Sequence, residues 1–265
     1  MSDATDRWLA SSTYDDFMGR WSRLLAPRFV SWLPARFDAH WLDVGCGTGA
    51  LCEAICSGAR PATVIGCDPS APFIDAARER CSDPRVSFVV AGVGDLPTRE
   101  GGFDRVTSAL ALNFFPDAEA AVVEMRRITA TGGLVAACVW DYAGRMEFLR
   151  YFWDSAEAID LEARELDEGR RFPICGPDAL EVLFRDSGLR EVVSGSIEIT
   201  TRFSDFADFW RPFLGGTGPA PSYVASLESR QRDALAEHLE NSLPLEPDGS
   251  ICLTARAWAV RGVAE

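Results

Sequence analysis

The chain has 265 residues, a formal net charge of −14 and 47% hydrophobic residues, enough for a large buried core. All 26 of its Lys and Arg residues are Arg, which excludes a P-loop lysine, a Schiff-base lysine and a Tyr-x-x-x-Lys pair. The acidic balance disfavours nucleic acid as the main partner, because phosphate binding needs a basic surface.

An aromatic-rich helical segment is predicted over residues 1–38, where Pro34 ends the helix. A regular alternation of short apolar runs and helical patterns follows. Strands are predicted at 41–45, 63–68, 86–91, 103–110 and 132–140, and helices at 48–56, 72–81 and 118–128. This alternation predicts an α/β fold, with a doubly wound parallel sheet between helical layers.

The pattern changes after Trp140. Helices are predicted within 141–170 and at 177–187, 203–214 and 222–240, and strands at 191–200 and 250–260. The helix at 203–214 is expected to carry a broad aromatic face.

Metal, membrane and export signals are weak in this sequence. Its eight Cys form no Cys-x-x-Cys pair and only two His are present, so no metal site is expected. No apolar run approaches the roughly 18 residues of a membrane span, and the polar, acidic start does not read as a secretory signal. Cysteines within apolar runs are typical of buried thiols in a reducing compartment, so a cytoplasmic location is expected.

The segment Leu42 to Gly49, LDVGCGTG, places three glycines in five positions between a strand and a helix. Glycine lets the backbone turn sharply and approach a ligand closely, and the following helix start presents free N–H groups. Asp68 ends the next strand, where a carboxylate can accept both hydroxyls of a ribose. This combination predicts a nucleoside-binding turn.

Two classes of ligand use such a turn. The spacing Gly45-x-Gly47-x-x-Ala50 also fits the dinucleotide fingerprint. Asp43 discriminates between them, because a carboxylate at the turn repels a pyrophosphate and suits the ammonium group of an amino-acid moiety beside a sulfonium.

These residues, together with GGFDRVTSALALNFFPD (101–117) and EMRRITATGG (124–133), resemble the class I S-adenosylmethionine-dependent methyltransferases. The resemblance covers about residues 40–140 and is nearest to the small-molecule, quinone-biosynthesis (methyltransferase type 11) group. It implies a seven-stranded sheet with an antiparallel last strand, provided by 250–260. It also divides the chain into a helical N-terminal lid (1–38), a Rossmann-like cofactor-binding core (39–140), a helical insertion or substrate cap (141–175) and a C-terminal completion of the sheet (176–265) with a helical segment at 203–240.

The resemblance implies S-adenosyl-L-methionine as the cofactor and gives roles to several residues. The turn glycines would wrap the methionine part, Asp68 would hold the ribose, and Gly92 and Val93 would flank the adenine. Arg20 and Tyr14 are proposed to close over the cofactor, with Arg20 meeting its carboxylate. The expected cofactor-binding residues are Tyr14, Arg20, Asp43, Gly45, Cys46, Gly47, Gly49, Asp68, Pro69, Gly92, Val93 and Leu110. The family often has an acidic residue at position 92, so either Asp95 replaces it or that hydrogen bond is absent.

The methyl acceptor is expected beyond the carboxyl ends of the strands. Asn113 could orient a hydroxyl or an amide there, while Trp140, Tyr142 and Trp210 could wall the pocket. Alignment of the acceptor would supply most of the catalysis, and a general base is optional. The candidates for a catalytic residue are Asn113, Asp141, Tyr142 and Tyr14.

The favoured function is therefore methyl transfer to a small organic molecule by a cytosolic enzyme. Three alternatives stay open at this point: an RNA or protein methyltransferase, a non-catalytic protein that binds S-adenosylmethionine, and an NAD-dependent oxidoreductase. The sequence does not reveal the acceptor atom or the oligomeric state.

Overall fold

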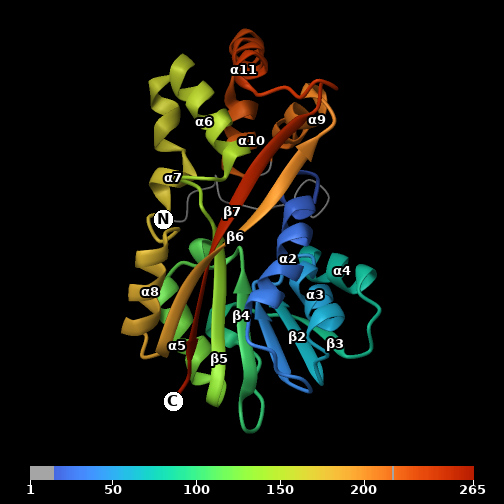
Figure 1. Ribbon diagram of the computed structural model, residues 1–265, viewed down its shortest axis with the longest axis vertical. Helices are drawn as coiled ribbons and strands as arrows, with labels where there is room; N and C mark the ends of the chain where they lie inside the picture. The colour runs from blue at the N-terminus through green and yellow to red at the C-terminus, as the bar shows by residue number, and fades with distance from the viewer. Residues whose placement is uncertain (1–14, 217) are drawn as a thin grey trace. The chain divides into compact units, whose positions relative to one another are not determined.

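A computed structural model describes residues 15–216 and 218–265 of the chain. Its sheet has seven strands in the order β3-β2-β1-β4-β5-β7-β6 (Figure 1). The strands are β1 (His40–Val44), β2 (Thr63–Asp68), β3 (Val86–Val90), β4 (Phe103–Ala109), β5 (Thr129–Trp140), β6 (Arg190–Phe203) and β7 (Ile251–Val263).

Strands β1 to β5 pair in parallel. Strand β7 runs antiparallel to β5, because Gly132 N–H bonds to Ala264 O at one end while Asp141 N–H bonds to Arg256 O at the other. The predicted α/β class, the parallel sheet and the antiparallel last strand are confirmed. Helix α3 (Ala50–Gly58) connects β1 to β2, α4 (Ala71–Arg80) connects β2 to β3 and α5 (Ala118–Arg127) connects β4 to β5, as parallel neighbours require, whereas the β3–β4 connection contains only the short helix η3 (Val93–Asp95).

The helices of the alternating part begin where the local sequence favours a helix start. Asp117 caps α5 (Ala118–Arg127) by accepting a hydrogen bond from Ala120 N–H at 2.9 Å. Pro72 lies in the first turn of α4 (Ala71–Arg80), and Pro177 opens α8 (Pro177–Asp186). The remaining long helices of this part are α2 (Arg20–Trp32), which follows the short helix η2 (Asp15–Gly19), and α3 (Ala50–Gly58).

Two predicted helices differ from the structure. The helix predicted at 222–240 is two helices, α10 (Pro219–Ser226) and α11 (Ser229–Ser242), because Leu227 is extended and Glu228 starts a new helix through a capping box with Gln231. The aromatic stretch at 203–214 is also divided: Phe203 belongs to β6, and α9 (Phe206–Trp210) and η6 (Arg211–Gly215) follow.

The chain forms two compact units, which are described separately here. The sheet unit comprises 21–139, 174–197 and 257–265. The helical unit comprises the described residues of 15–20, 140–173 and 198–256. The sheet unit holds β1 to β4 and α3 to α5, with a core that includes the fully buried Trp41, Leu42 and Phe103.

The helical unit contains α6 (Glu147–Ile159), η5 (Leu161–Glu165), α7 (Glu168–Arg171) and the helices α9 to α11. Its core is largely aromatic. Phe152 stacks on Phe213 with ring centroids 4.5 Å apart, and Phe17 meets Phe148 and Phe213 edge-on. The aromatic residues of 203–213 therefore serve mainly as core here, since Phe203, Phe209 and Phe213 are buried.

Candidate functional site

The turn between β1 and α3 is built from glycines in left-handed backbone conformations. Gly45, Gly47 and Gly49 have φ angles of 74°, 52° and 87°, a region that side chains with a Cβ rarely adopt. The N–H groups of Gly45 and Cys46 both donate to Cys67 O, at 2.8 and 3.0 Å. The turn is thereby fixed to the end of β2.

The glycines of this turn differ in their surroundings. A Cβ on Gly45 would lie 2.6 Å from Ala111 Cβ, so the backbone there is packed against the segment after β4. A Cβ on Gly49 would lie 3.2 Å from the Phe88 ring. No heavy atom lies within 4 Å of the corresponding position on Gly47. The turn is therefore tightly supported at Gly45 and open at Gly47.

Asp68 faces this turn from the end of β2. Its Oδ2 accepts a hydrogen bond from Gly47 N–H at 3.0 Å, and its Oδ1 accepts one from Ser70 N–H at 2.9 Å. Burial raises the pKa of Asp68, while these two N–H groups act to lower it. Each carboxylate oxygen keeps lone pairs for a ligand hydroxyl.

Asp43 lies in β1 directly before the turn and is 1% exposed. Cys52 Sγ donates to its Oδ2 at 3.5 Å, and its Oδ1 has no hydrogen-bond partner among the described residues. Burial raises the Asp43 pKa to about 7; the Cys52 contact opposes this rise and the charge of Asp68 adds to it. A buried acceptor without a donor is uncommon and points to a missing partner.

The thiols around the turn are poor nucleophiles. Burial raises the pKa values of Cys67 and Cys138 far above the ordinary thiol range. A thiolate is the reactive form of cysteine. These side chains therefore act as small apolar packing groups, as the sequence predicts.

The segment after β3 lies next to Asp68 along the sheet, since β2 pairs with β3. Gly92 is extended, and a Cβ there would lie 3.9 Å from Pro69 Cβ. Val93 begins the short helix η3 (Val93–Asp95), whose last residue, Asp95, is exposed. Whether Asp95 contacts an adenine stays a prediction.

The segment after β4 carries a strained residue and a buried amide. Leu110 has a φ of 61°, and its N–H donates to Cys138 O at 2.8 Å. Asn113 follows in η4 (Leu112–Phe114) and is 8% exposed. Neither its Oδ1 nor its Nδ2 has a hydrogen-bond partner among the described residues.

The expected site residues are divided between the two units. The sheet unit contains Asp43, Gly45, Cys46, Gly47, Gly49, Asp68, Pro69, Gly92, Val93, Leu110 and Asn113. The helical unit contains Arg20, Trp140, Asp141, Tyr142 and Trp210, and Tyr14 lies outside the described residues. The hydrogen bonds described above join Gly45, Cys46 and Gly47 to the end of β2, whereas the Asn113 side chain makes none with the described residues.

The expected site residues of the helical unit have contacts of their own. Arg20 Nη1 donates to Asp208 Oδ1 at 3.0 Å, and the guanidinium lies 4.5 Å from the Phe203 ring centroid. Tyr142 is buried beside Phe172, and Trp210 stacks on Phe206. Trp140 is buried as well. Their roles toward a cofactor or an acceptor stay predictions.

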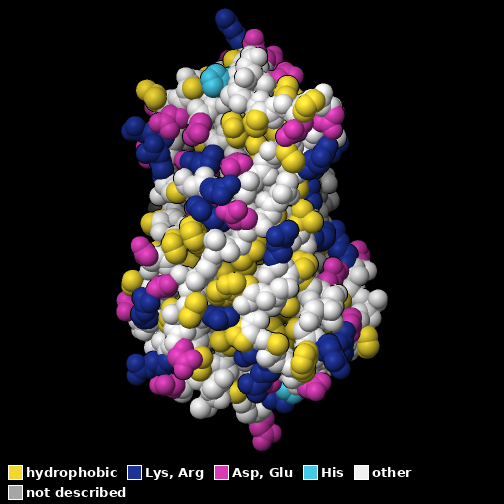
Figure 2. All heavy atoms as spheres, viewed as in Figure 1, with side chains coloured by type: hydrophobic (Ala, Val, Ile, Leu, Met, Phe, Trp, Pro, Cys, Tyr) yellow, Lys and Arg dark blue, Asp and Glu magenta, His cyan; other side chains and the backbone are white. Residues whose placement is uncertain are grey.

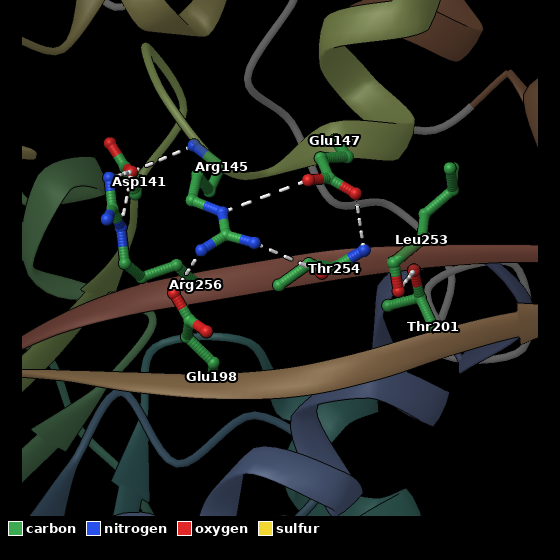
Figure 3. Close-up of polar contacts among 8 residues, drawn as sticks. All are labelled: Asp141, Arg145, Glu147, Glu198, Thr201, Leu253, Thr254 and Arg256. Atoms are coloured by element: carbon green, nitrogen blue, oxygen red, sulfur yellow. Dashed lines mark hydrogen bonds and ion pairs between the residues drawn. The ribbon is translucent and has the colours of Figure 1, made fainter.

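Asp141 anchors a network of charges in the helical unit (Figure 3). Arg256 donates to its Oδ2 from Nε and Nη2, at 2.8 and 2.6 Å, and Arg145 N–H donates to the same oxygen at 2.8 Å. Arg145 also pairs with Glu198 at 2.9 Å. With three donors, the Asp141 carboxylate is suited to hold residues 141–145 against Arg256 of β7. A role for Asp141 as a general base stays a prediction.

Three further residues support the turn without a local motif that predicts the contact. Ala111 and Phe88 contact the positions of Gly45 and Gly49 from far along the chain, and Cys52 donates to Asp43 from the next helix. The only signal in the sequence is that Phe88 lies within a predicted strand and Ala111 directly after one. In the described part of the chain, no group of three or more potential ligands is placed to hold a metal ion, and no helix has the length and apolarity to cross a membrane.

A family model described as a methyltransferase domain (Methyltransf_11) matches residues 42–137. Demethylmenaquinone methyltransferase from Roseiflexus castenholzii is 29% identical over 57% of this chain and 68% of its own length. The enzyme of that name from Thermus thermophilus is 34% identical over 43% of this chain, but the match spans only 51% of that relative.

Solved structures show the same fold at low sequence identity. A phosphoethanolamine N-methyltransferase from Haemonchus contortus, solved with S-adenosylhomocysteine, superposes with a TM-score of 0.58 at 15% identity. The alignment covers 96% of this chain and 57% of that one. At this identity the likeness concerns the fold.

Sheet order and glycine turn together define a Rossmann-like methyltransferase fold. Residues 42–137 match the methyltransferase domain of the type 11 group, so the expected class I S-adenosylmethionine-dependent methyltransferase domain is supported over this part of the chain. The Haemonchus contortus structures of this fold contain S-adenosylmethionine or S-adenosylhomocysteine, the expected cofactor and its product.

Proposed function

We propose that this protein transfers a methyl group from S-adenosylmethionine to a small organic acceptor. The observation that carries the proposal is the glycine turn, which is open at Gly47 and bonded to the buried carboxylate of Asp68. The residues fit the cofactor because the unpartnered Oδ1 of Asp43 suits a cationic donor beside the same turn. An ammonium group supplies such a donor.

The proposed contacts follow the positions of these groups. Asp68 would accept hydrogen bonds from ribose hydroxyls, and Gly47 would let the backbone approach the methionine part. Asp43 would balance the ammonium charge. Gly92 and Val93 would flank the adenine. Pro69 and Leu110 are further proposed cofactor-binding residues. Arg20 and Tyr14 are proposed to meet the carboxylate of the cofactor.

Methyl transfer from this cofactor requires mainly that the protein position the acceptor. When bound, the cofactor supplies a methyl group on a sulfonium, already activated toward in-line displacement. The chain would hold the acceptor behind that carbon and keep water away. The described thiols near the turn are held neutral, so a covalent intermediate on cysteine has no support here.

Two observations support a small-molecule acceptor. The relatives named above act, by their names, on demethylmenaquinone, which is a quinone rather than a nucleic acid or a protein. The chain has a net charge of −14, and on the face drawn in Figure 2 basic and acidic side chains are interspersed rather than gathered by sign. Nucleic acid would call for a basic surface.

The test combines binding and turnover. Calorimetry should show that S-adenosylhomocysteine binds and that NADH does not. Transfer of tritiated methyl groups should then be measured on a quinol set, on total tRNA and on a protein extract. Label in the quinol fraction is expected. Tight binding of NADH would refute the cofactor assignment, and label confined to tRNA or protein would refute the small-molecule acceptor.

A matched variant makes the binding test specific to the site. Asp68→Ala should lose affinity for S-adenosylhomocysteine, whereas Asp233→Ala, at an exposed position of α11, should bind like the parent protein. Equal affinity of all three proteins would show that Asp68 does not hold the ribose.

A further inference from the structure

We propose that Asn113 binds the methyl acceptor through a neutral group of that molecule which both donates and accepts a hydrogen bond, as a hydroxyl does. The inference rests on the proposed methyl transfer and specifies the chemical class of its acceptor. It excludes acceptors that present a carboxylate, a phosphate or an ammonium group to this residue.

The buried amide of Asn113 carries the inference. The residue is 8% exposed, and neither Oδ1 nor Nδ2 has a hydrogen-bond partner among the described residues. Most buried side-chain polar atoms in folded proteins are paired, because leaving one unpaired costs free energy. An amide with both ends unpaired therefore calls for a partner that the folded chain alone does not supply.

The surrounding backbone holds this amide in place. Leu110 adopts a left-handed conformation with φ at 61°, which is unfavourable for a bulky residue. Ala111 packs against Gly45, where an added Cβ would lie 2.6 Å from Ala111 Cβ and 3.4 Å from the Phe115 ring. Backbone strain of this kind persists where the surrounding structure fixes it, and it gathers at ligand sites.

Asn113 follows β4 at the carboxyl ends of the strands, the edge of the sheet where the acceptor is expected. Strand β4, which leads into Leu110, pairs directly with β1, and Asp43 lies opposite Thr107 in that pairing. Ligands of open α/β sheets bind beyond the carboxyl ends of the strands. Asn113 thus follows the strand adjoining β1, two residues after Ala111, which contacts Gly45.

The chemistry of an amide selects the class of ligand. Its oxygen only accepts hydrogen bonds and its NH₂ only donates them. A carboxylate or phosphate dianion would leave Oδ1 unpaired, and an ammonium group would leave Nδ2 unpaired. A hydroxyl pairs with both atoms. Asp43 on β1, which adjoins β4, and Asp68 on β2, one strand further, also disfavour an anionic acceptor when they are ionised.

Composition makes a direct test possible. The chain contains only two asparagines, Asn113 and the exposed Asn241. Labelling asparagine side chains with ¹⁵N therefore gives two NH₂ signals, one from the proposed site and one that serves as an internal control. A titration of the protein saturated with S-adenosylhomocysteine can then follow phenol, benzoate and benzylammonium separately.

Phenol is expected to shift the Asn113 signals in a saturable way and leave those of Asn241 in place, with benzoate and benzylammonium far weaker. Unmoved Asn113 signals with phenol, or a stronger response to either ion, would overturn the inference. Binding of S-adenosylhomocysteine is measured in the same samples. If it fails, the proposed function fails; if it succeeds while Asn113 does not respond, only this inference fails.

A variant separates acceptor binding from cofactor binding. Asn113→Leu, which keeps the size and removes both polar atoms, is expected to leave the Kd for S-adenosylhomocysteine within about twofold and to raise the Kd for phenol by roughly tenfold or more. Asn241→Leu should change neither. A parallel loss of cofactor affinity in Asn113→Leu would assign the residue to the cofactor instead.

Discussion

Gly47 N–H donates a hydrogen bond to Asp68 Oδ2 at 3.0 Å, so the open position of the glycine turn is joined directly to the carboxylate that ends β2. Gly47 lies in the turn that follows β1 and Asp68 ends β2, and the carboxyl ends of these neighbouring parallel strands meet at one edge of the sheet. This bond orients the carboxylate before any ligand binds. Such preorganisation reduces the free energy that binding must spend on ordering.

Asp68 gives the first prediction. Asp68→Ala is expected to weaken binding of S-adenosylhomocysteine by about 1–3 kcal/mol, because hydrogen bonds to a charged acceptor are lost. Calorimetry measures this directly. Asp75→Ala, which removes an exposed carboxylate of α4 paired with Arg78, is the matched control and should bind normally. A Kd for Asp68→Ala equal to that of the control would show that the carboxylate does not contact the ligand.

Gly45 and Gly47 are expected to respond differently to substitution by alanine. Gly45→Ala brings its Cβ to 2.6 Å from Ala111 Cβ, so it should lower the free energy of unfolding more than Gly47→Ala, which meets no atom within 4 Å. In both variants the alanine must adopt a left-handed backbone conformation, which costs about 1–2 kcal/mol of stability. Urea unfolding compares their stabilities.

The effect of these two variants on ligand affinity is expected to differ from their effect on stability. Gly47→Ala adds a methyl group where the turn is open, so its main loss is expected in affinity for S-adenosylhomocysteine. If Gly47→Ala proves the less stable of the two yet binds the ligand as well as the parent protein, the open position is not a ligand site.

Asp43 gives a prediction about pH. Its pKa is raised from 3.8 to about 7 by burial, so the folded protein retains a proton that the unfolded chain has already released. The stabilising contribution of this group is complete below about pH 4 and is lost as the pH rises to about 7. Asp43→Asn should remove a slope of up to about 1.4 kcal/mol per pH unit in that window.

Denaturant unfolding at several pH values measures this slope. Asp43→Asn should also weaken binding of S-adenosylhomocysteine at pH 8, because the ammonium group loses its counter-charge. A pH dependence identical to that of the parent protein would show that Asp43 is ionised in the fold.

Glu168, in the helical unit, provides an independent pH prediction. The residue is 3% exposed, its Oε2 accepts a hydrogen bond from Trp153 Nε1 at 2.5 Å, and burial raises its pKa to about 7. The sign is the same as for Asp43, since a raised pKa makes stability fall as the pH rises from about 4.5 to about 7. Glu168→Gln should keep the Trp153 bond and flatten this part of the pH profile, with unchanged affinity for S-adenosylhomocysteine. A profile that stays as steep as that of the parent protein would contradict the prediction.

Asp141 and Arg256 give a prediction about stability. The Asp141 side chain is 7% exposed and that of Arg256 23%, so removing the guanidinium leaves a largely buried carboxylate with fewer donors. Arg256→Ala is expected to lower the free energy of unfolding by about 2–4 kcal/mol. This is somewhat less than the loss for a fully buried ion pair, because Arg256 is partly exposed.

The exposed pair of Arg190 and Glu265 is the control, and Arg190→Ala should cost well under about 1 kcal/mol. If Asp141→Asn abolishes methyl transfer but unfolds at the same denaturant concentration as the parent protein, Asp141 acts as a base rather than as an anchor.

The antiparallel direction of the closing strand was expected from the family resemblance, whereas the amino-acid sequence by itself determined the alternating strands and helices up to Trp140 and the glycine turn with Asp68. These features follow from neighbouring residues: apolar runs, helix starts and glycine spacing are local. The break between α10 and α11 was also written locally, in the Glu228 and Gln231 capping box, but the helical pattern on both sides obscured it.

Tertiary structure decided everything that depends on which distant residues meet. Only the folded chain shows that Ala111 closes one end of the turn, that Arg256 pairs with Asp141, and that Asn113 is buried without a partner. Burial and pairing depend on contacts between strands many residues apart, and the sequence pattern records each residue's type but not its surroundings. The pKa of Asp43 illustrates the difference, because the carboxylate was visible in the sequence and the desolvation that raises its pKa was not.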